Sequence, residues 1–420
     1  MRTFREAARV LRHRDYRWLW AGQSTSAVGD SLVFVALALF ITDRTGNPTD
    51  LGLVLAAGAA PLIAFLLLGG VWADRLPRHA VVVVTDLICA ALEALFATLI
   101  FTGEIEIWQI VAIMALFGTA EAFFRPAVAG LVPQTVPESD IQQANALMGV
   151  SRNVATFAGP ALATALILTA GAGWAFAIDA GTFLVSAVCL SRVRPRQRSA
   201  AVLPVEQRRR SVRSELREGY VEVRARSWIW VTLVAFAVVE FAAVAPLFVL
   251  GPLVAREQYG HTAVFGIRVA MIGIGTIAGS LIGIGWRPRH PMRMALLLIL
   301  LWPPSLILYG AGVTLAVVLP AAVLGGAGLA LFDTWWSTAL AERVPPDRLS
   351  RVSSYDWLVS AGLLPAGYVA VGPLGHWLGA APVLIGGAAL GLLAALAALI
   401  PHETRMLERT AQSAGHASAP

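Results

Sequence analysis

The chain has 420 residues, of which 57% are hydrophobic and only 14% are charged. A soluble domain carries about 25% charged residues, so this composition excludes an ordinary water-soluble protein and indicates a membrane protein. The sequence contains no lysine, so all 32 residues counted as Lys or Arg are arginine, and with 26 acidic residues they give a net charge of +6.

Apolar stretches of about 20 residues recur along the whole chain, each long enough to cross a hydrocarbon core of about 30 Å. Backbone amides in lipid must be hydrogen-bonded within their own segment, so these stretches are predicted to be helices. The fold class is therefore all-α and polytopic. We expect twelve transmembrane helices, at residues 18–42, 51–73, 80–102, 107–128, 143–169, 172–191, 228–254, 263–286, 292–312, 314–341, 350–375 and 380–400.

The arginines are distributed unevenly between the links. Of the 32 arginines, 27 fall at the two ends or in alternate links between the predicted spans. The opposite links hold only Arg44 and Arg256. Because positive residues are retained on the cytoplasmic side, both termini and the central link are predicted to be cytoplasmic, in a bacterial inner or plasma membrane. The basic charge thus sets topology, and we expect no nucleic-acid partner.

The two halves of the chain repeat. Placing residues 18–20 (Trp-Leu-Trp) on residues 228–230 (Trp-Ile-Trp) requires an offset of 210, and Asp30 then falls on Glu240. Six spans followed by six in the same orientation form a parallel repeat, with a substrate site near the midplane between the halves. We expect an N-terminal six-helix half, a cytoplasmic linker with an amphipathic segment, a C-terminal six-helix half and a disordered tail, at residues 1–191, 192–226, 227–403 and 404–420.

The second link, Gly-Gly-Val-Trp-Ala-Asp-Arg-Leu-Pro-Arg-His at residues 69–79, resembles the signature of the major facilitator superfamily between spans two and three. The matching residues are Gly70, Asp74, Arg75 and Arg78. The resemblance implies that Asp74 latches the cytoplasmic side shut against the start of span eleven, near residues 350–354. The alternative is a positive turn that only fixes topology. In the second half Gly285 stands at the position of Asp74, so the latch is one-sided.

Other stretches resemble the enterobactin-exporter and macrolide-efflux branch of this superfamily. They lie at residues 18–30, 122–163 and 177–187. The resemblance implies the major facilitator fold and export of an amphipathic small molecule, such as an antibiotic, a siderophore or a secreted metabolite, by proton antiport. Gly159 and Pro160 resemble the start of the antiporter motif of span five. Ala163 and Thr164 replace the glycines that follow in that motif, so the match is partial.

Several ionisable residues fall inside the predicted spans. At the bilayer centre each costs about 2.5–3.5 kcal/mol, so each needs a partner, water or a function. Asp30 is the first candidate for proton coupling, because it lies in a small, polar stretch that water or substrate can approach. Glu240, Asp179 and Glu93 lie at a similar depth and are further candidates. The alternative for each is a carboxyl group with a purely structural role.

Charged and polar residues closer to the cytoplasmic ends suggest a gate and a cavity. Glu121 and Arg125 are four residues apart on one predicted helix, and they either join Asp86 and the signature residues in a cytoplasmic gate or simply neutralise each other. Arg268 is expected to extend to the outer membrane surface. Candidates for the substrate cavity are Ser26, Phe34, Arg152 and Asn153. The alternative role of Phe34 is packing between helices. The alternative role of Arg152 is a structural ion pair with Glu121 or Asp86.

The sequence contains no Walker motif, metal-binding cluster or catalytic triad. We therefore predict a transporter, not an enzyme, that needs no cofactor or metal and uses the proton gradient as its energy source. Its expected partners are a small-molecule substrate and the lipid bilayer, and it is expected to be a monomer. An importer, a lipid transporter or a uniporter of the same fold is an alternative. A membrane sensor that transports nothing is a weaker one.

Overall fold

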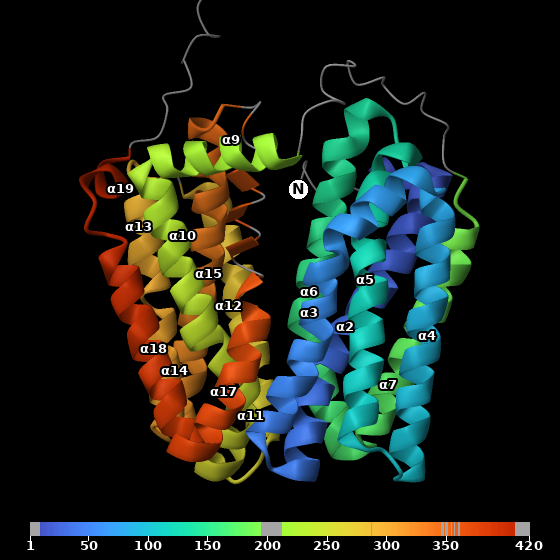
Figure 1. Cartoon of the computed structure of the whole chain (residues 1–420), viewed down its shortest axis with the longest axis horizontal. Coiled ribbons are helices and arrows are strands. Elements are labelled where there is room, and N and C mark those ends of the chain that lie inside the picture. Colours follow the sequence, from blue (N-terminus) through green and yellow to red (C-terminus); the bar gives the residue numbers. More distant parts are fainter. Residues whose placement is uncertain are drawn as a thin grey trace, which may run out of the picture. The chain divides into compact units, whose positions relative to one another are not determined.

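The computed structural model describes residues 9–194, 212–286, 288–345, 348, 352–353, 355–356, 358–359 and 362–407, without the side chains of residues 67–75, 212–216, 218–219 and 284. Nearly all of these residues are helical, and none of them lies in a strand. The helices (Figure 1) are η1 (Val10–Arg12), α2 (Arg14–Thr45), α3 (Pro48–Arg75), α4 (Arg78–Thr102), α5 (Ile107–Thr135), η2 (Glu138–Asp140), α6 (Ile141–Thr169), α7 (Ala172–Ser191), α9 (Val212–Ala225), α10 (Ser227–Val239), η3 (Glu240–Val244), α11 (Ala245–Tyr259), α12 (Ala263–Gly285), α13 (Pro291–Ile299), α14 (Trp302–Gly310), α15 (Leu315–Arg343), α17 (Leu364–Leu378), α18 (Ala380–Ala397) and α19 (His402–Met406).

Ten described helical segments are long and apolar enough to cross a membrane, and they match ten of the twelve predicted spans. The predicted span at 143–169 is the 29-residue helix α6, whose first half is interrupted by polar residues such as Gln142 and Asn145. The span at 350–375 is continuously described only from Gly362, and α17 begins at Leu364. The all-α, polytopic fold is confirmed.

Two predicted spans are interrupted helices. The span at 228–254 consists of α10 and α11 joined by the π-helical turn η3, which begins at Glu240. The span at 292–312 consists of α13 and α14, with the break just before Pro303 and Pro304. A proline lacks the backbone N–H and clashes with the carbonyl one turn earlier, so two consecutive prolines end the preceding helix.

The two arginines of the opposite links, Arg44 and Arg256, donate hydrogen bonds to backbone carbonyl groups. Nη2 of Arg44 donates to the carbonyl oxygen of Ile105 over 2.8 Å, and Nη1 of Arg256 donates to that of Thr42 over 3.0 Å. Thr42 lies in the last turn of α2, which ends at Gly46 in the left-handed conformation (φ 64°). A guanidinium at the carboxyl end of a helix also interacts favourably with the helix dipole.

Contacts between residues divide the chain into two compact units. The first unit contains the helices from α2 to α7, α11, the start of α12 and α17. Within it, α2 packs on α6 and α7, α4 packs on α5 and α7, and α3 packs on α5. At the crossing of α3 and α5, a Cβ on Gly118 would collide with the backbone of Gly58, so glycine permits the close approach.

The second unit contains α9, α10, η3, the rest of α12, α13, α14, α15, most of α18 and α19. Its core is a buried cluster that includes Trp228, Leu296, Trp335 and Leu340. Helix α15 packs on α13 and α14. The predicted division into two six-helix halves stays a prediction, and residues 195–211 of the predicted linker and 408–420 of the predicted tail lie outside the described residues.

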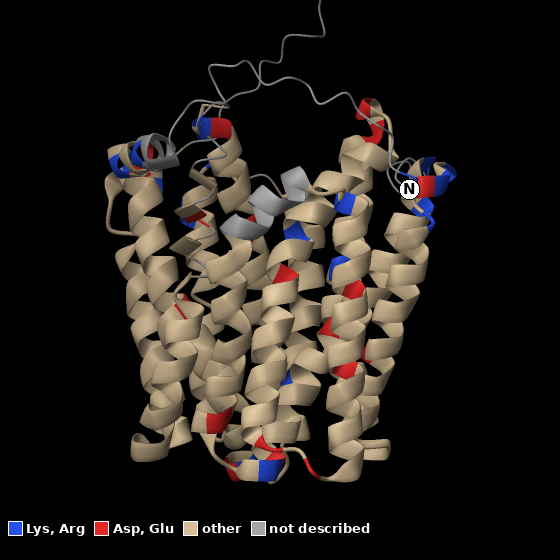
Figure 2. Cartoon of the chain, turned by 45° about the vertical axis from the view of Figure 1, so that its right-hand side comes forward, with Lys and Arg blue, Asp and Glu red and all other residues tan. Residues whose placement is uncertain are grey.

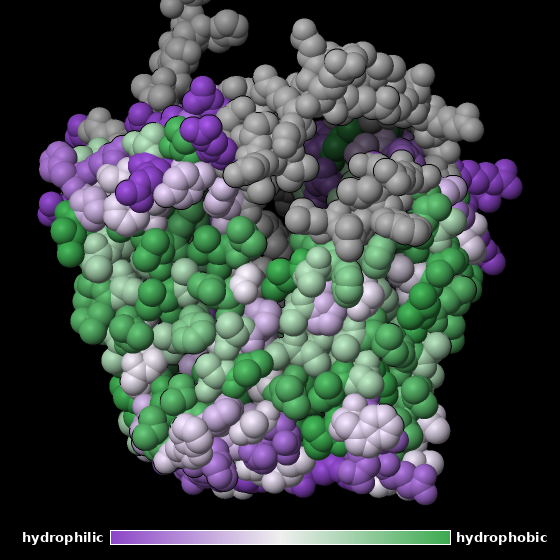
Figure 3. Space-filling model, in the orientation of Figure 1, coloured by the Kyte–Doolittle hydropathy of each residue, from purple (hydrophilic) through white to green (hydrophobic). Residues whose placement is uncertain are grey.

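Charged residues gather at the ends of the helices, and few lie along their middle parts (Figure 2). On the face shown in Figure 3, hydrophobic side chains cover the middle of the helices between hydrophilic ends. This distribution suits helices that cross a hydrocarbon layer.

The amphipathic segment predicted in the central link forms α9, which lies across the end of α10 (Figure 1). The buried carboxylate of Glu222 accepts hydrogen bonds from Arg226, at the corner between the two helices, and from Nη1 of Arg348 over 2.6 Å. Burial by itself raises the pKa of Glu222, but the two guanidinium groups outweigh burial and hold this pKa below its usual value. We infer that Glu222 fixes the direction in which α9 leaves α10.

Replacement of Glu222 by Gln should therefore destabilise the protein in a pH-dependent way. The lowered pKa means that the carboxylate stabilises the fold above about pH 4.3, the usual pKa of glutamate, and stops doing so as the pH falls through the lowered value. At pH 7 we expect a loss on the order of 1 kcal/mol, seen as a lower melting temperature of the purified protein. The difference from wild type should shrink below pH 4. The exposed loop variant Glu104→Gln should behave as wild type, and equal melting temperatures for all three proteins at pH 7 would contradict the role of Glu222.

Candidate functional site

The first unit holds a group of ionisable side chains from four helices. Asp30 of α2 is within electrostatic range of every other member, and neighbouring members also interact with one another. The sequence predicts two separate sets, a proton-coupling set and a gate, and the structure brings members of both together. We call this group the acid cluster; its members are Asp30, Asp86, Glu93, Glu121, Arg125 and Asp179.

Members of the acid cluster differ in their access to solvent. Asp86, Glu93 and Asp179 are at most 1% exposed, whereas Asp30 is exposed. The side chain of Arg125 is 47% exposed. Water or a ligand can therefore reach the cluster through Asp30, while three carboxyl groups lie inside the protein.

Close packing of α2 on α7 brings Asp179 of the acid cluster against the backbone of α2. Gly22, Ser26 and Gly29 are spaced by four and three residues, so they share one face of α2. A Cβ on Gly29 would lie 2.9 Å from Cγ of Asp179 and even closer to its Oδ1 atom and to the hydroxyl of Thr182. Small residues let two helices approach in this way. Ser26 is buried on this face.

The buried carboxyl groups have few hydrogen bonds. The hydroxyl of Thr182 donates to Oδ1 of Asp179 over 2.8 Å. Within the described residues, Oδ2 of Asp179 and Oε2 of Glu93 have no hydrogen-bond partner. Buried polar atoms without a partner are rare and need an explanation.

The acid cluster has an unbalanced charge. Nε of Arg125 donates to Oε2 of Glu121 over 2.9 Å, in the same-helix pairing that the sequence predicted. With all five carboxyl groups ionised and Arg125 protonated, the cluster would carry four unbalanced negative charges. Two such charges about 6 Å apart repel by about 3 kcal/mol at an effective dielectric constant of 20. The charge of the cluster must therefore depend on how many protons it binds.

The residues of the predicted signature are only partly described. The backbone of Gly70, Asp74 and Arg75 belongs to the end of α3, but their side chains lie outside the described residues, as do residues 350, 351 and 354. The guanidinium of Arg78, at the start of α4, lies against Gly130 of α5, where a Cβ would collide with it. The latch of Asp74 stays a prediction.

The cavity candidates occupy different places in the first unit. Phe34 packs edge-on against Phe248 of α11, with ring centroids 4.9 Å apart, and is 39% exposed. Arg152 and Asn153 are exposed on α6. Glu121 pairs with Arg125, so it does not need Arg152 as its partner.

Residues of the partial antiporter motif bring α6 close to α2. A Cβ on Gly159 would collide with Ser31 of α2, and Pro160 is buried next to it. The hydroxyl of Thr164 donates to the carbonyl oxygen of Pro160 over 2.7 Å. Thr164, which replaces a glycine of the motif, thus bonds to its own helix.

The expectation for Arg268 was wrong. Its side chain is fully buried on α12, in the first unit, instead of extending to the membrane surface, and it lies within electrostatic range of Tyr259. Glu240 lies in the other unit, at the first position of the π-helical turn η3. Single π turns inside α-helices are frequent at functional sites.

Sequence reasoning missed a pocket in the second unit. Its volume is about 220 Å³. Residues at positions 329, 332, 333 and 336 line it from one face of α15, and that i, i+3, i+4, i+7 spacing was the signal available in the sequence. The lining residues are Thr232, Leu233 and Phe236 of α10, Leu329, Phe332, Asp333 and Trp336 of α15, and Asp356.

Comparison with known proteins identifies the family. A sequence model of the Major Facilitator Superfamily matches residues 19–356. The chain belongs to the major facilitator superfamily. Membership in this superfamily confirms the prediction of a multi-pass membrane transporter and not an enzyme, in a family whose members generally need no cofactor.

Relatives of this major facilitator protein include named efflux proteins. It is 22% identical over 363 residues to macrolide efflux protein A of Streptococcus pyogenes, and this alignment covers 84% of this chain and 87% of the relative. It is 25% identical over 307 residues to the multidrug efflux pump Tap of Mycolicibacterium fortuitum, covering 70% and 71% of the two chains. The predicted resemblance to macrolide efflux proteins is confirmed.

Solved structures support the same fold. The crystal structure of the nucleoside transporter NupG matches with a TM-score of 0.71 at 11% identity, over 92% of this chain and 98% of that one. At this identity the likeness concerns the fold alone.

The close contact of α2 with α7 can be tested by adding a methyl group. Gly29→Ala would force Asp179 and Thr182 away from α2, and we expect a loss of about 1–3 kcal/mol, measured as a lower melting temperature. Gly181→Ala, on α7 itself, has nothing within 4 Å of the new Cβ and should match or slightly exceed wild type. Equal stability of the two variants would contradict the described packing.

Proposed function

We propose that this major facilitator protein exports an amphipathic small molecule from the cell in exchange for protons. Export is supported by its relatives, which are named macrolide and multidrug efflux proteins. Proton exchange is supported by the acid cluster, in which five carboxyl groups and one arginine interact inside membrane-spanning helices. The acid cluster is the observation that carries this proposal.

Asp30 is proposed as the residue that exchanges protons with solvent, because it is exposed and interacts with the buried members of the cluster. Glu93 and Asp179 are proposed as the groups that share the proton after Asp30 takes it up. A proton and a cationic substrate each remove one negative charge from the cluster. Binding of one therefore weakens binding of the other, which is the physical basis of exchange.

For the cytoplasmic gate we propose Asp86 and the pair of Glu121 and Arg125, together with the signature residues Gly70, Asp74, Arg75 and Arg78. The side chain of Arg125 is 47% exposed. Arg125 can therefore leave Glu121 for another partner without breaking a fully buried ion pair. Glu240 is proposed as a second coupling site, because it begins a π turn and single π turns inside α-helices are frequent at functional sites. We propose that four residues line the substrate cavity, namely Ser26, Phe34, Arg152 and Asn153. Gly159 and Pro160 are proposed as part of the antiporter motif of span five.

The proposed energy source is the proton gradient across a bacterial cytoplasmic membrane, with both termini inside and the protein acting as a monomer. Moving one charge through 100 mV supplies about 2.3 kcal/mol. One proton per substrate therefore supports a gradient of nearly fifty-fold.

Proton exchange can be measured in everted membrane vesicles that contain a pH-sensitive dye. Adding a substrate from a panel of macrolides and cationic dyes should release the proton gradient with wild-type protein. Asp30→Asn should reduce this release at least about tenfold, because the exchanged proton loses its binding group. Glu104→Gln, which removes an exposed carboxyl group outside the cluster, is the control.

Equal release by wild type and Asp30→Asn would transfer the coupling role to Glu240 and Asp179. Substrate flux without any proton release would replace the antiporter proposal with a uniporter.

The direction of transport has a separate test. Cells that express the protein should accumulate less of a transported compound than cells that express Asp30→Asn, and should tolerate a higher concentration of it. Greater accumulation in the wild-type cells would show an importer.

A further inference from the structure

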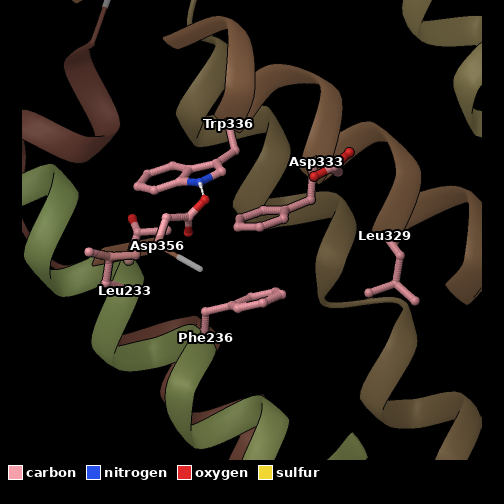
Figure 4. Close-up of a pocket in the computed structure, with 8 residues that line it drawn as sticks. Leu233, Phe236, Leu329, Asp333, Trp336 and Asp356 are labelled. Carbon is pink, nitrogen blue, oxygen red and sulfur yellow. Dashed lines mark hydrogen bonds between the residues drawn. The ribbon is translucent and has the colours of Figure 1, made fainter. Parts of the chain in front are cut away.

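The pocket of the second unit combines aromatic walls with acidic groups. The rings of Phe236 and Phe332 are nearly parallel, at 8°, with centroids 5.6 Å apart. The ring of Phe332 and the indole of Trp336 are also parallel, at 6°, with centroids 6.4 Å apart. Figure 4 shows Phe236 on one helix facing the rings of α15 across the space that Asp356 adjoins. Three aligned rings give a flat apolar ligand a surface to lie on.

The acidic groups of the pocket are unbalanced. Nε1 of Trp336 donates to Oδ2 of Asp356 over 3.1 Å (Figure 4), which fixes the carboxylate beside the indole. Asp333 is within electrostatic range of Asp356. The eight lining residues include no arginine or histidine. The pocket therefore presents negative charge next to aromatic faces, the combination that attracts organic cations.

A buried hydroxyl group of the pocket lacks a hydrogen-bond partner in the described part of the chain. Thr232 lines the pocket, is only 2% exposed, and its Oγ1 atom has no hydrogen-bond partner among the described residues. A buried hydroxyl without a partner costs about 1–3 kcal/mol. A ligand that donates an N–H to Oγ1 would remove this cost.

Other ligand classes fit less well. An anion would meet Asp333 and Asp356 without a compensating positive charge. A hard metal ion needs six or more oxygen ligands, and the described residues contain no group of three or more His, Cys, Asp or Glu side chains placed to hold one. At about 220 Å³ the pocket is smaller than the roughly 300–1,000 Å³ that hold whole drug-sized ligands. It suits one ring with its amine.

We propose that this pocket binds the protonated amine and adjoining ring of an amphipathic organic cation. The ring lies against Phe236, Phe332 and Trp336. The ammonium group is neutralised by Asp333 and Asp356, and one of its N–H groups donates to the hydroxyl of Thr232. This inference rests on the proposed export function in one respect, because it takes the bound cation to be the exported substrate. It then assigns the chemical class of that substrate and one place where it binds.

The test compares two ligands of equal shape, phenethylammonium and the neutral phenethyl alcohol. Their dissociation constants are measured on the purified full-length protein in detergent, by saturation-transfer NMR, without any gradient. Wild type should bind the amine at least about tenfold more tightly than the alcohol, the difference expected for a hydrogen-bonded charge.

Two variants locate the binding. Asp356→Asn keeps an oxygen that accepts from Trp336 and removes one of the two acidic charges, so it should reduce the preference for the amine severalfold and leave binding of the alcohol unchanged. Thr232→Val has the same shape as the native residue and should weaken binding of the amine severalfold. Thr338→Val, whose hydroxyl bonds to the backbone of its own helix, is the matched control and should bind both ligands as wild type does.

No preference for the amine in wild type would overturn the proposal, and so would an unchanged preference in both Asp356→Asn and Thr232→Val. If Asp356→Asn does not fold, Thr232→Val and Asp333→Asn decide the question. Binding that follows the prediction together with vesicles that release no protons would refute the proposed exchange and leave the pocket standing. Proton release without selective binding of the amine would refute the pocket proposal and leave the proposed exchange standing.

Discussion

The contact of α2 with α7 at Gly29 is the interaction on which the acid cluster depends. Without a side chain at position 29, the carboxyl group of Asp179 can lie against the backbone of α2, one residue from Asp30. Thr182 holds one oxygen of Asp179, and the other has no partner in the described part of the chain. Ionised groups in a membrane interior are expensive, so the net negative charge of five carboxyl groups and one arginine favours the binding of protons by the cluster.

The two repeats carry different chemistry at corresponding positions. An offset of 208 residues places Gly118 on Gly326 and Phe124 on Phe332, and it then places Arg125 on Asp333. In the first unit Arg125 pairs with Glu121 beside the buried acids. In the second unit Asp333 lines a pocket with three aligned aromatic rings and no basic residue. The predicted repeat thus places different ionisable side chains at corresponding positions of its two halves.

The sequence predicted helices well because their causes are local. Apolar length and the need to satisfy backbone amides in lipid act within one segment, so ten of the twelve predicted spans recur as described helices of that kind. The sequence did not predict the breaks inside two of these spans. Pro303 and Pro304 divide one span, and Glu240 begins a π turn in another. Arg268 was misplaced because its position near a span end does not reveal that neighbouring helices bury it.

The sequence by itself determined the fold class, ten spans that recur as long apolar helices in the described part of the chain, and the ionisable residue types inside the spans, because hydrophobic length and the cost of intramembrane charge can be read one segment at a time. Only the tertiary structure decided that Asp30, Glu93, Glu121 and Asp179 form one cluster, since they come from four helices separated by up to 149 residues. It also revealed the pocket at Trp336 and Asp356, because the direction of each side chain depends on how the helices rotate against one another when they pack.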